Sequence, residues 1–229
     1  MRDEVLYHQK AAIVDNVTRY IRDLAARSLL DIGAGGAETA LPLSKLVDRY
    51  HAIEQNPHYA ARLENAGLKV SRGTFPLALD ETYDLVLSSH SVPELLIEPY
   101  AAFLSSAWRL TAPGGLLLVI TFKGSRGDLA EVRQELLGEP PAPSEEHDTI
   151  MRNFQRLGGR VRTERVNSYV EARKPGHIAS FLEPWLTQDP AMQASIHHAF
   201  TGIVETRYKV RDGLYVFPTQ HLFISCRRQ

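Results

Sequence analysis

A short apolar stretch of the sequence breaks into a glycine-rich turn that carries an acid at its start. Residues 29–37 read LLDIGAGGA. Gly33 and Gly35 lack a Cβ atom, so the backbone there can adopt a positive φ and pass close to a ligand. The next residues have a helical pattern, and the free N–H groups of a helix N-terminus would face the same ligand. This spacing predicts a cofactor site on a strand–turn–helix unit, although an ordinary tight turn would use the same residue types.

Two classes of cofactor bind to turns of this kind. A dinucleotide-binding turn reads G-x-G-x-x-G, or has alanine in the last place, where this chain has Glu38. The pattern acid-x-G-x-G-x-G, ending on the small residue Ala37, fits better. That pattern resembles the first motif of the class I S-adenosylmethionine (SAM) methyltransferases. The resemblance implies a cofactor contact for four residues of the turn: Asp31, Gly33, Ala34 and Gly35.

A second acid ends the next predicted strand. Glu54 lies 21 positions after Gly33. Parallel sheets bind ligands at the carboxyl ends of their strands, and an acid about 20 residues after the turn can accept hydrogen bonds from ribose hydroxyls. An ionised carboxylate has only acceptors, which suits a diol. The segment EQNP at 54–57 also resembles the acid-x-Ser/Asn-Pro stretch of many of these methyltransferases, so we expect Glu54 and Gln55 at the cofactor.

Two later segments resemble the same family in the same order. Residues 83–89 (YDLVLSS) look like its fourth strand, which would place Ser88 and Ser89 at the cofactor. Residues 110–115 (LTAPGG) are similar to the family's L-x-P-G-G turn before the fifth strand. The resemblance covers about residues 28–122. It implies an enzyme that uses SAM as methyl donor and releases S-adenosylhomocysteine (SAH), and it fixes neither the acceptor nor a catalytic base.

The sequence departs from the family after the predicted third strand. Many members have a Gly-Asp pair there, whose acid binds the adenine amino group. This chain has Gly73 and Thr74, followed by Phe75. Thr74 can donate or accept one hydrogen bond, and Phe75 could stack on the purine. A core position for Phe75 is an equally weighted alternative to adenine contact.

His90 is the candidate catalytic residue, in the segment SSHSVPE at 88–94. The Asn/Asp-Pro-Pro-Tyr motif of many amino-methyltransferases is absent there, the only cysteine is Cys226 in the last predicted strand, and no clustered carboxylates for Mg²⁺ are visible. We therefore expect metal-independent transfer to oxygen. An imidazole with a pKa of about 6.5 could take a proton from a hydroxyl. Contact with cofactor or substrate is the alternative role, because a carboxylate acceptor needs positioning and no base.

Candidate acceptor-binding residues lie in two other parts of the chain. Tyr7 opens the first predicted helix, which in this family often folds over SAM. Tyr169 and Trp185 belong to a late segment, and predicted helices within 175–200 would cover the mouth of the active site. For Phe181 and Trp185, ordinary amphipathic packing is the interpretation that we favour.

A basic stretch at 152–174 leaves other functions open. It contains seven arginines and lysines and only two acidic residues, Glu164 and Glu171. Such a stretch could contact RNA phosphates, so an RNA methyltransferase is one alternative and a non-catalytic SAM-binding protein is another. The whole chain has 26 basic and 27 acidic residues, which gives no general attraction to nucleic acid or membrane. We interpret the stretch as a solvated face and expect a small-molecule acceptor.

An alternation of strands and helices must position these residues. The predicted strands are 28–32, 50–54, 68–71, 84–88 and 116–121. The predicted helices between and before them are 5–26, 37–49, 57–66 and 99–110. This order predicts an α/β fold with right-handed crossovers: a doubly wound, mostly parallel, seven-stranded sheet, as in the Rossmann-like methyltransferase fold, with a helical insertion over the active site.

The second half changes character. It has a proline-rich loop, and its predicted elements are helices at 144–157, 175–186 and 190–200 and strands at 160–166 and 214–226, the last interrupted at Pro218-Thr219. The length of 229 residues suits a single methyltransferase domain. We divide it into an N-terminal helix (1–27), a SAM-binding core (28–135), a substrate-side region and lid (136–213) and a closing strand (214–229).

Cysteine content and hydropathy bear on location. One cysteine excludes an internal disulfide, and no apolar run reaches the roughly 18 residues of a membrane helix. The first residues are not those of a signal peptide. We expect a cytoplasmic monomer or homodimer with no membrane partner.

Overall fold

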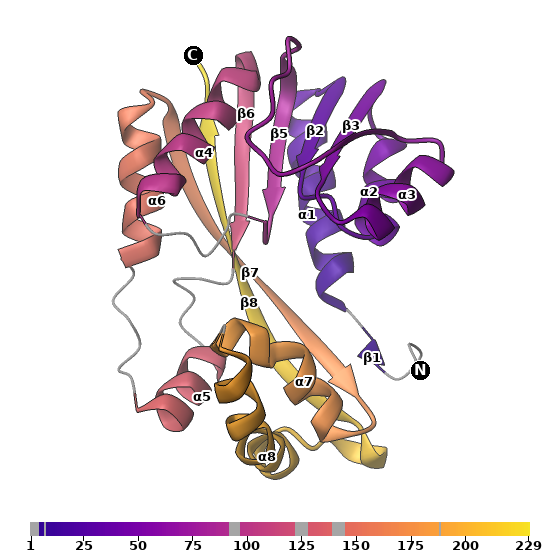
Figure 1. The fold of residues 1–229 in the computed structure, drawn as a ribbon, viewed down its shortest axis with the longest axis vertical. Coiled ribbons are helices and arrows are strands. Elements are labelled where there is room, and N and C mark those ends of the chain that lie inside the picture. Colours follow the sequence, from indigo (N-terminus) through magenta and orange to yellow (C-terminus); the bar gives the residue numbers. More distant parts are fainter. Residues whose placement is uncertain (1–4, 7, 92–96, 122–127, 139–144, 188) are drawn as a thin grey trace. The chain divides into compact units, whose positions relative to one another are not determined.

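The computed structural model divides the chain into two compact units (Figure 1). It describes all residues except 1–4, 7, 92–96, 122–127, 139–144 and 188. The sheet unit comprises Ile13–Thr121, Glu145–Glu164 and Leu222–Gln229. The helical unit comprises Met1–Ala12, Phe122–Ser144 and Arg165–His221. Each unit has its own buried core, and each is described by itself.

The sheet unit has a parallel sheet at its centre. Its strands are β2 (Ser28–Ile32), β3 (Arg49–Glu54), β4 (Lys69–Arg72), β5 (Tyr83–Ser89) and β6 (Thr111–Thr121). β2 pairs in parallel with both β3 and β5, β3 with β4, and β5 with β6. The chain thus builds the sheet first in one direction from β2 and then in the other. The order reverses between β2 and β5, and in such sheets ligands bind at the carboxyl ends of the strands beside that point.

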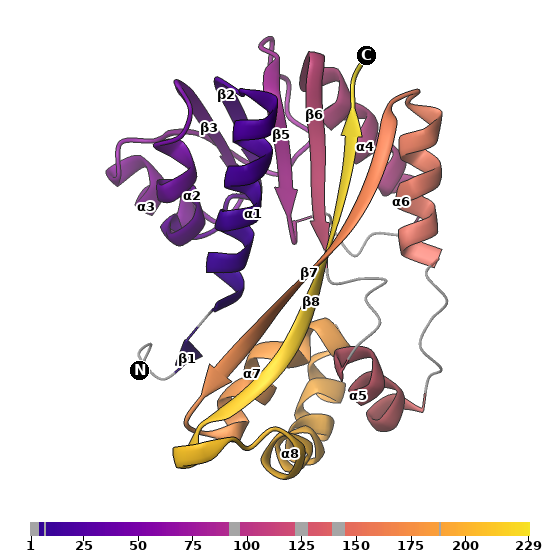
Figure 2. The ribbon, with the colours of Figure 1, turned by 180° about the vertical axis from the view of Figure 1, so that it is seen from behind.

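The central strands of the sheet are buried on both faces because helices cover both. The helices of this unit are α1 (His8–Leu24, which starts in the helical unit), α2 (Ala37–Ser44), α3 (Pro57–Asn65), α4 (Ile97–Leu110) and α6 (Glu145–Arg156). Figure 1 shows α4 in front of the sheet, and Figure 2, seen from behind, shows α1 in front of the opposite face. All five residues of β2 are buried, as expected for a strand covered on both sides.

Local sequence signals account for α3, the helix that follows Glu54. Asn56 caps α3, with its side-chain oxygen accepting hydrogen bonds from the backbone N–H groups of His58 (2.9 Å) and Tyr59. Pro57 occupies the first turn, where its missing N–H costs nothing. The chain therefore leaves β3 and turns into α3 at a fixed point, which fixes the backbone next to Glu54.

The helical unit contains the last helices of the chain. Its elements are α5 (Asp128–Leu137), α7 (Pro175–Leu186), α8 (Pro190–Arg207), the 3₁₀ helix η1 (Arg211–Gly213) and the two-residue strand β1 (Val5–Leu6). β1 pairs antiparallel with the end of β7 (Arg160–Ala172). Phe200 and Phe217 lie within its apolar core, edge to face at 5.9 Å between ring centroids. Asp189 caps α8 by accepting a hydrogen bond from the N–H of Ala191 at 2.9 Å.

Most predicted elements are present, and the doubly wound, mostly parallel sheet is confirmed. Among the described residues the sheet has the order β1-β7-β8-β6-β5-β2-β3-β4, so the short β1 adds an eighth strand to the seven predicted. β8 (Tyr215–Arg227) is continuous, so the predicted interruption at Pro218-Thr219 is wrong; Pro218 is exposed within the strand. β7 extends to Ala172, six residues beyond its predicted end, because alternate positions from Val166 onward are buried.

No helix in the described part of the chain is both long and apolar enough to span a membrane.

Candidate functional site

The glycine-rich turn begins where β2 ends. Gly33 has φ = 72° and Gly35 has φ = 60°, values that residues with a side chain rarely adopt. The N–H groups of Gly33 and Ala34 both point at the carbonyl oxygen of Ile53, at 2.8 and 3.2 Å between N and O. The turn is therefore anchored to the end of β3, and its backbone conformation requires glycine at both positions.

Glu54 joins this turn to the start of α3. Its side chain is buried, with 5% exposed. One carboxylate oxygen accepts a hydrogen bond from the N–H of Gly35 at 2.6 Å, and the other accepts one from the N–H of Asn56 at 2.7 Å. Each carboxylate oxygen has a second lone pair, so Glu54 keeps acceptor capacity for a ligand. The structure thus places Glu54 directly against the glycine turn, as the spacing predicted, while its bond to ribose stays a prediction.

Asp31 is a second buried acid beside the turn. It is 3% exposed, and the Tyr50 hydroxyl donates a hydrogen bond to it at 2.6 Å. Burial raises the pKa of Asp31 to about 6, the nearby Glu54 charge adds to the rise, and the Tyr50 hydrogen bond opposes it. The charge of Asp31 consequently changes near neutral pH.

The end of β4 completes the same edge of the sheet. The N–H of Gly73 donates to the backbone oxygen of Glu54 at 3.0 Å. The Thr74 hydroxyl donates to the side-chain oxygen of Gln55 at 3.1 Å. The carboxyl ends of β2, β3 and β4 therefore bring the turn, Glu54, Gln55 and Thr74 together, and contact of these residues with a cofactor stays a prediction.

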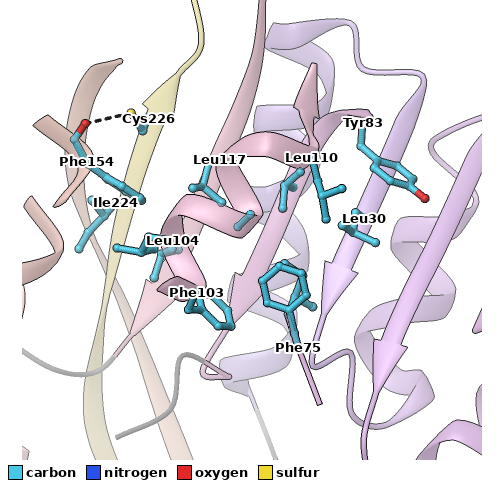
Figure 3. Close-up of a cluster of buried hydrophobic side chains, with 14 of the residues drawn as sticks. Leu30, Phe75, Tyr83, Phe103, Leu104, Leu110, Leu117, Phe154, Ile224 and Cys226 are labelled. Atoms are coloured by element: carbon cyan, nitrogen blue, oxygen red, sulfur yellow. Dashed lines mark hydrogen bonds between the residues drawn. The ribbon is translucent and has the colours of Figure 1, made fainter. Parts of the chain in front are cut away.

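Phe75 lies in the apolar core of the sheet unit. Its ring is 7% exposed and packs edge to face on Phe103 of α4, with the ring centroids 5.0 Å apart (Figure 3). Leu30 and Tyr83 belong to the same cluster. This placement is the core position that the sequence left open as the alternative. Contact between Phe75 and a purine stays a prediction. Little of the Phe75 ring surface is exposed for such a contact.

The bend after β5 carries the predicted serines and His90. Ser88 is fully buried, and Ser89 pairs in register with Ile120 of β6. His90 has a left-handed backbone with φ = 53°, and its N–H donates to the oxygen of Ile120 at 2.9 Å. Residues that are not glycine seldom adopt this conformation, and they do so disproportionately at functional sites. His90 therefore stands at the carboxyl edge of the sheet, beside β6.

The predicted acceptor-binding residues lie elsewhere. Tyr7 is outside the described residues. Tyr169 lies on the part of β7 in the helical unit and is 37% exposed. Trp185 lies on α7 and packs, half-buried, against the core of the helical unit, which is the packing role that we favoured for it. Contact of these three residues with an acceptor, and a lid formed by 175–200, stay predictions.

Sequence reasoning missed two residues of the site, Tyr50 and Ser91. Tyr50 pairs with Leu29 across the strands, so Asp31, two residues further along β2, is its diagonal neighbour. The register of β2 and β3 is therefore the signal that identifies the Tyr50–Asp31 pair. Ser91 contacts the glycine turn from the bend after β5, and no sequence spacing indicates this contact.

The basic stretch begins at the opposite edge of the same unit. Arg156 and Arg160 are exposed and flank Gly159, whose missing Cβ would lie 2.9 Å from the backbone oxygen of Arg227. Arg227 pairs in turn with Leu116, in the first half of β6. These arginines are thus at the amino-terminal end of the parallel strands, whereas the glycine turn and His90 are at the carboxyl-terminal end.

Comparisons with known proteins agree with this architecture. Residues 30–119 match the family model described as a methyltransferase domain. Three solved structures share the fold: the YcgJ protein of Bacillus subtilis, magnesium protoporphyrin IX methyltransferase of Synechocystis PCC 6803 with bound SAH, and precorrin-6y C5,15-methyltransferase of Geobacter metallireducens. Their identities to this chain are 15%, 13% and 15%, and their TM-scores are 0.62, 0.59 and 0.54.

The similarity extends over nearly the whole chain. The alignments cover 97%, 97% and 93% of this chain and 99%, 84% and 86% of the respective structures. At these identities the likeness concerns the fold alone. No curated protein matches the sequence.

Proposed function

We propose that the chain is a class I SAM-dependent methyltransferase that transfers the methyl group of SAM to an oxygen atom of a small molecule. Its residues 30–119 match the model of a methyltransferase domain. The observation that carries this proposal is the meeting of three strand ends at Glu54. There a buried carboxylate holds both the glycine turn and the start of α3. We place the enzyme in the cytoplasm, because a chain with one cysteine cannot form an internal disulfide and cytoplasmic proteins rarely have one.

The residues at this edge fit the chemical groups of SAM. The free lone pairs of Glu54 suit a ribose diol, and the Thr74 hydroxyl with Gln55 offers a donor and acceptor pair to a purine edge. At Gly35, which has a positive φ, a Cβ atom would meet no other atom closer than 4.0 Å, so a ligand can approach the bare backbone there closely. When bound, SAM supplies an electrophilic methyl group. The protein residues bind it, orient the acceptor toward it and keep water away.

His90 is the residue that we assign to the acceptor side. Its backbone is fixed at the carboxyl edge by the bond to Ile120, which places the imidazole on the bend beside the cofactor edge. For a hydroxyl acceptor, a ring nitrogen of His90 takes the proton as the new C–O bond forms. For a carboxylate acceptor no proton has to leave, and positioning alone carries the rate.

A small-molecule acceptor is supported by two observations. The relatives from Synechocystis and Geobacter are named for a magnesium protoporphyrin and a precorrin, which are small molecules. In addition, Arg156 and Arg160 lie at the amino-terminal edge of the parallel strands. An RNA held there would be far from the carboxyl edge where the methyl group is transferred.

Metal-independent transfer remains part of the proposal. Within the described ranges, three or more histidine, cysteine or acidic side chains do not come together as metal ligands would.

A methyl-transfer screen tests the proposal. Purified protein is incubated with SAM labelled in its methyl group, separately with a metabolite extract and with total RNA. We expect label in an alkali-sensitive ester or a stable ether of a small molecule. Label in RNA that is lost at higher salt would instead identify an RNA methyltransferase. SAM binding without any labelled acceptor would favour a non-catalytic SAM-binding protein.

A further inference from the structure

A serine that belongs to none of the predicted contacts ties two bends of the sheet edge together. The hydroxyl of Ser91 donates to the backbone oxygen of Ile32 at 2.5 Å. It also lies 3.0 Å from the hydroxyl of Ser88. A serine hydroxyl has a single proton, and that of Ser91 is engaged by Ile32, so Ser88 must be the donor in the second bond. The result is a directed chain from buried Ser88 through Ser91 to the last residue of β2.

Ser91 also touches the glycine turn itself. A Cβ atom added to Gly33 would overlap the Cβ of Ser91 and would lie 2.8 Å from its hydroxyl oxygen. The bare face of Gly33 is therefore filled by the side chain of Ser91. The bend after β5 and the turn after β2 are in direct contact, and neither can move far without the other.

This contact lies one residue from His90. On its amino side the left-handed His90 is held by its N–H bond to Ile120. On its carboxyl side it is held by the Ser91 hydroxyl on Ile32. The backbone of His90 is thus fixed between β6 and β2, the two neighbours of β5.

We propose that Ser91 is a positioning residue: its hydroxyl holds the His90 bend against the glycine turn, so that cofactor binding at the turn and the orientation of His90 are coupled. The inference rests on the proposed function, because it takes the glycine turn as the SAM site. It goes beyond that function by naming the residue through which the cofactor side and the acceptor side of the site communicate.

The first test compares Ser91→Ala with Ser91→Thr, which restores a hydroxyl. Affinity for SAH is measured by calorimetry, and the imidazole signals of His90, assigned with a His90→Gln variant, are followed by NMR. We expect Ser91→Ala to weaken SAH binding about three- to tenfold, the effect of losing one hydrogen bond, and to abolish the SAH-dependent shift of the His90 signals. Ser91→Thr should recover both.

A control variant removes a different serine hydroxyl that also donates a hydrogen bond to a backbone carbonyl. Ser195 donates to the oxygen of Met192 at 2.8 Å on α8, in the helical unit. Ser195→Ala should leave SAH affinity and the His90 signals unchanged. If Ser91→Ala binds SAH like the parent with an unchanged His90 response, or if Ser91→Thr is as impaired as Ser91→Ala, the positioning role is wrong. A parent protein that binds no SAH would instead overturn the proposed function.

A double-mutant cycle tests the contact without any ligand. Gly33→Ala should lower the melting temperature, because its new Cβ overlaps Ser91 and because Gly33 has a positive φ. Adding Ser91→Gly removes the overlap. The melting temperature of the double variant should therefore be higher than the value obtained by adding the shifts of the two single variants. Additive shifts would show that the two residues do not touch, and would contradict the coupling.

Discussion

At the residue scale, the site depends on two buried carboxylates with different tasks. Glu54 accepts hydrogen bonds from two backbone N–H groups and so shapes the loops around it. Asp31 accepts one from Tyr50 and has a raised pKa. The sequence predicted both acids from their spacing to Gly33. It could not predict that Glu54 would hold the backbone as well as a ligand, because that depends on where the N–H groups of Gly35 and Asn56 point.

The dual task of Glu54 makes a testable prediction. Glu54→Ala should weaken SAH binding and also lower the free energy of unfolding by about 1–3 kcal/mol, because the N–H groups of Gly35 and Asn56 lose their acceptor. Calorimetry and chemical denaturation measure the two effects. Glu64→Ala, which removes an exposed acid paired with Arg72, is the control and should change neither appreciably. A Glu54→Ala protein as stable as the parent would show that these two bonds contribute little.

Asp31 makes the stability of the fold depend on pH. Its folded pKa, about 6, is above its ordinary value of 3.8, so its contribution is complete below the ordinary value and is lost as the pH rises through about 6. Relative to Asp31→Asn, the parent should lose up to about 3 kcal/mol of unfolding free energy between about pH 4 and pH 8. Denaturation curves of both proteins across this range measure the difference.

The control for this measurement is Asp48→Asn, which alters an exposed carboxylate. This variant shows the effect of removing one exposed negative charge. If the difference between the parent and Asp31→Asn is flat, or grows in the parent's favour as the pH rises, the raised pKa of Asp31 is contradicted.

At the element scale, the local pattern of the sequence was sufficient for most elements, including α7 of the helical unit, and insufficient for the full length of β7. β2, α3 and β5 could be predicted because apolar strands and helix caps are local signals. The full length of β7 could not, because Ser168 occupies a buried position and disguises the alternation. The Ser168 hydroxyl forms hydrogen bonds with the side chains of Thr219 at 2.7 Å and His221 at 2.8 Å. These partners are 51 and 53 residues away in the sequence, so no local pattern reveals them.

Two adjacent glycines lie between α6 and β7, and each is needed for a different reason. Gly158 is needed for its backbone conformation, and Gly159 is needed because its neighbours leave no room for a side chain. Gly158 has φ = 75° with no atom within 4 Å of an added Cβ, whereas an added Cβ on Gly159 would lie 2.6 Å from the Trp108 ring and 2.9 Å from the Arg227 oxygen. Gly158→Ala should lower the free energy of unfolding by about 1 kcal/mol. Gly159→Ala should cost more, about 1–3 kcal/mol, through overpacking. Equal melting temperatures for the two variants would contradict this close packing.

At the scale of the whole molecule, the first arginines of the basic stretch lie away from the proposed cofactor edge of the sheet. The net charge is −1, and the arginines at the start of β7 lie at the edge of the parallel strands opposite to Glu54. The sequence predicted the cofactor edge of this fold and left the role of the arginines open. Only the pairing of β8 with β6, and the approach of Gly159 to Arg227, shows to which edge they belong.

This separation predicts the outcome of a charge reversal. The double change Arg156→Glu and Arg160→Glu alters two exposed side chains at the amino-terminal edge. SAH affinity and the labelling of a small-molecule acceptor should therefore stay within about twofold of the parent, because exposed charges at this distance are largely screened by salt. Loss of methyl transfer in this variant, with SAH affinity retained, would move the acceptor site to the basic stretch and favour a nucleic-acid substrate.

The central claim is that the edge formed by the glycine turn and Glu54 binds SAM. Calorimetric titration of the purified protein with SAM and SAH tests it most directly, with Gly33→Val as the variant in which a branched side chain overlaps Ser91 and forces the turn out of its conformation. The account predicts one saturable site for each ligand in the parent protein and no measurable binding in a folded Gly33→Val variant. Absence of binding to the parent at millimolar ligand, or unchanged binding to the variant, would contradict it.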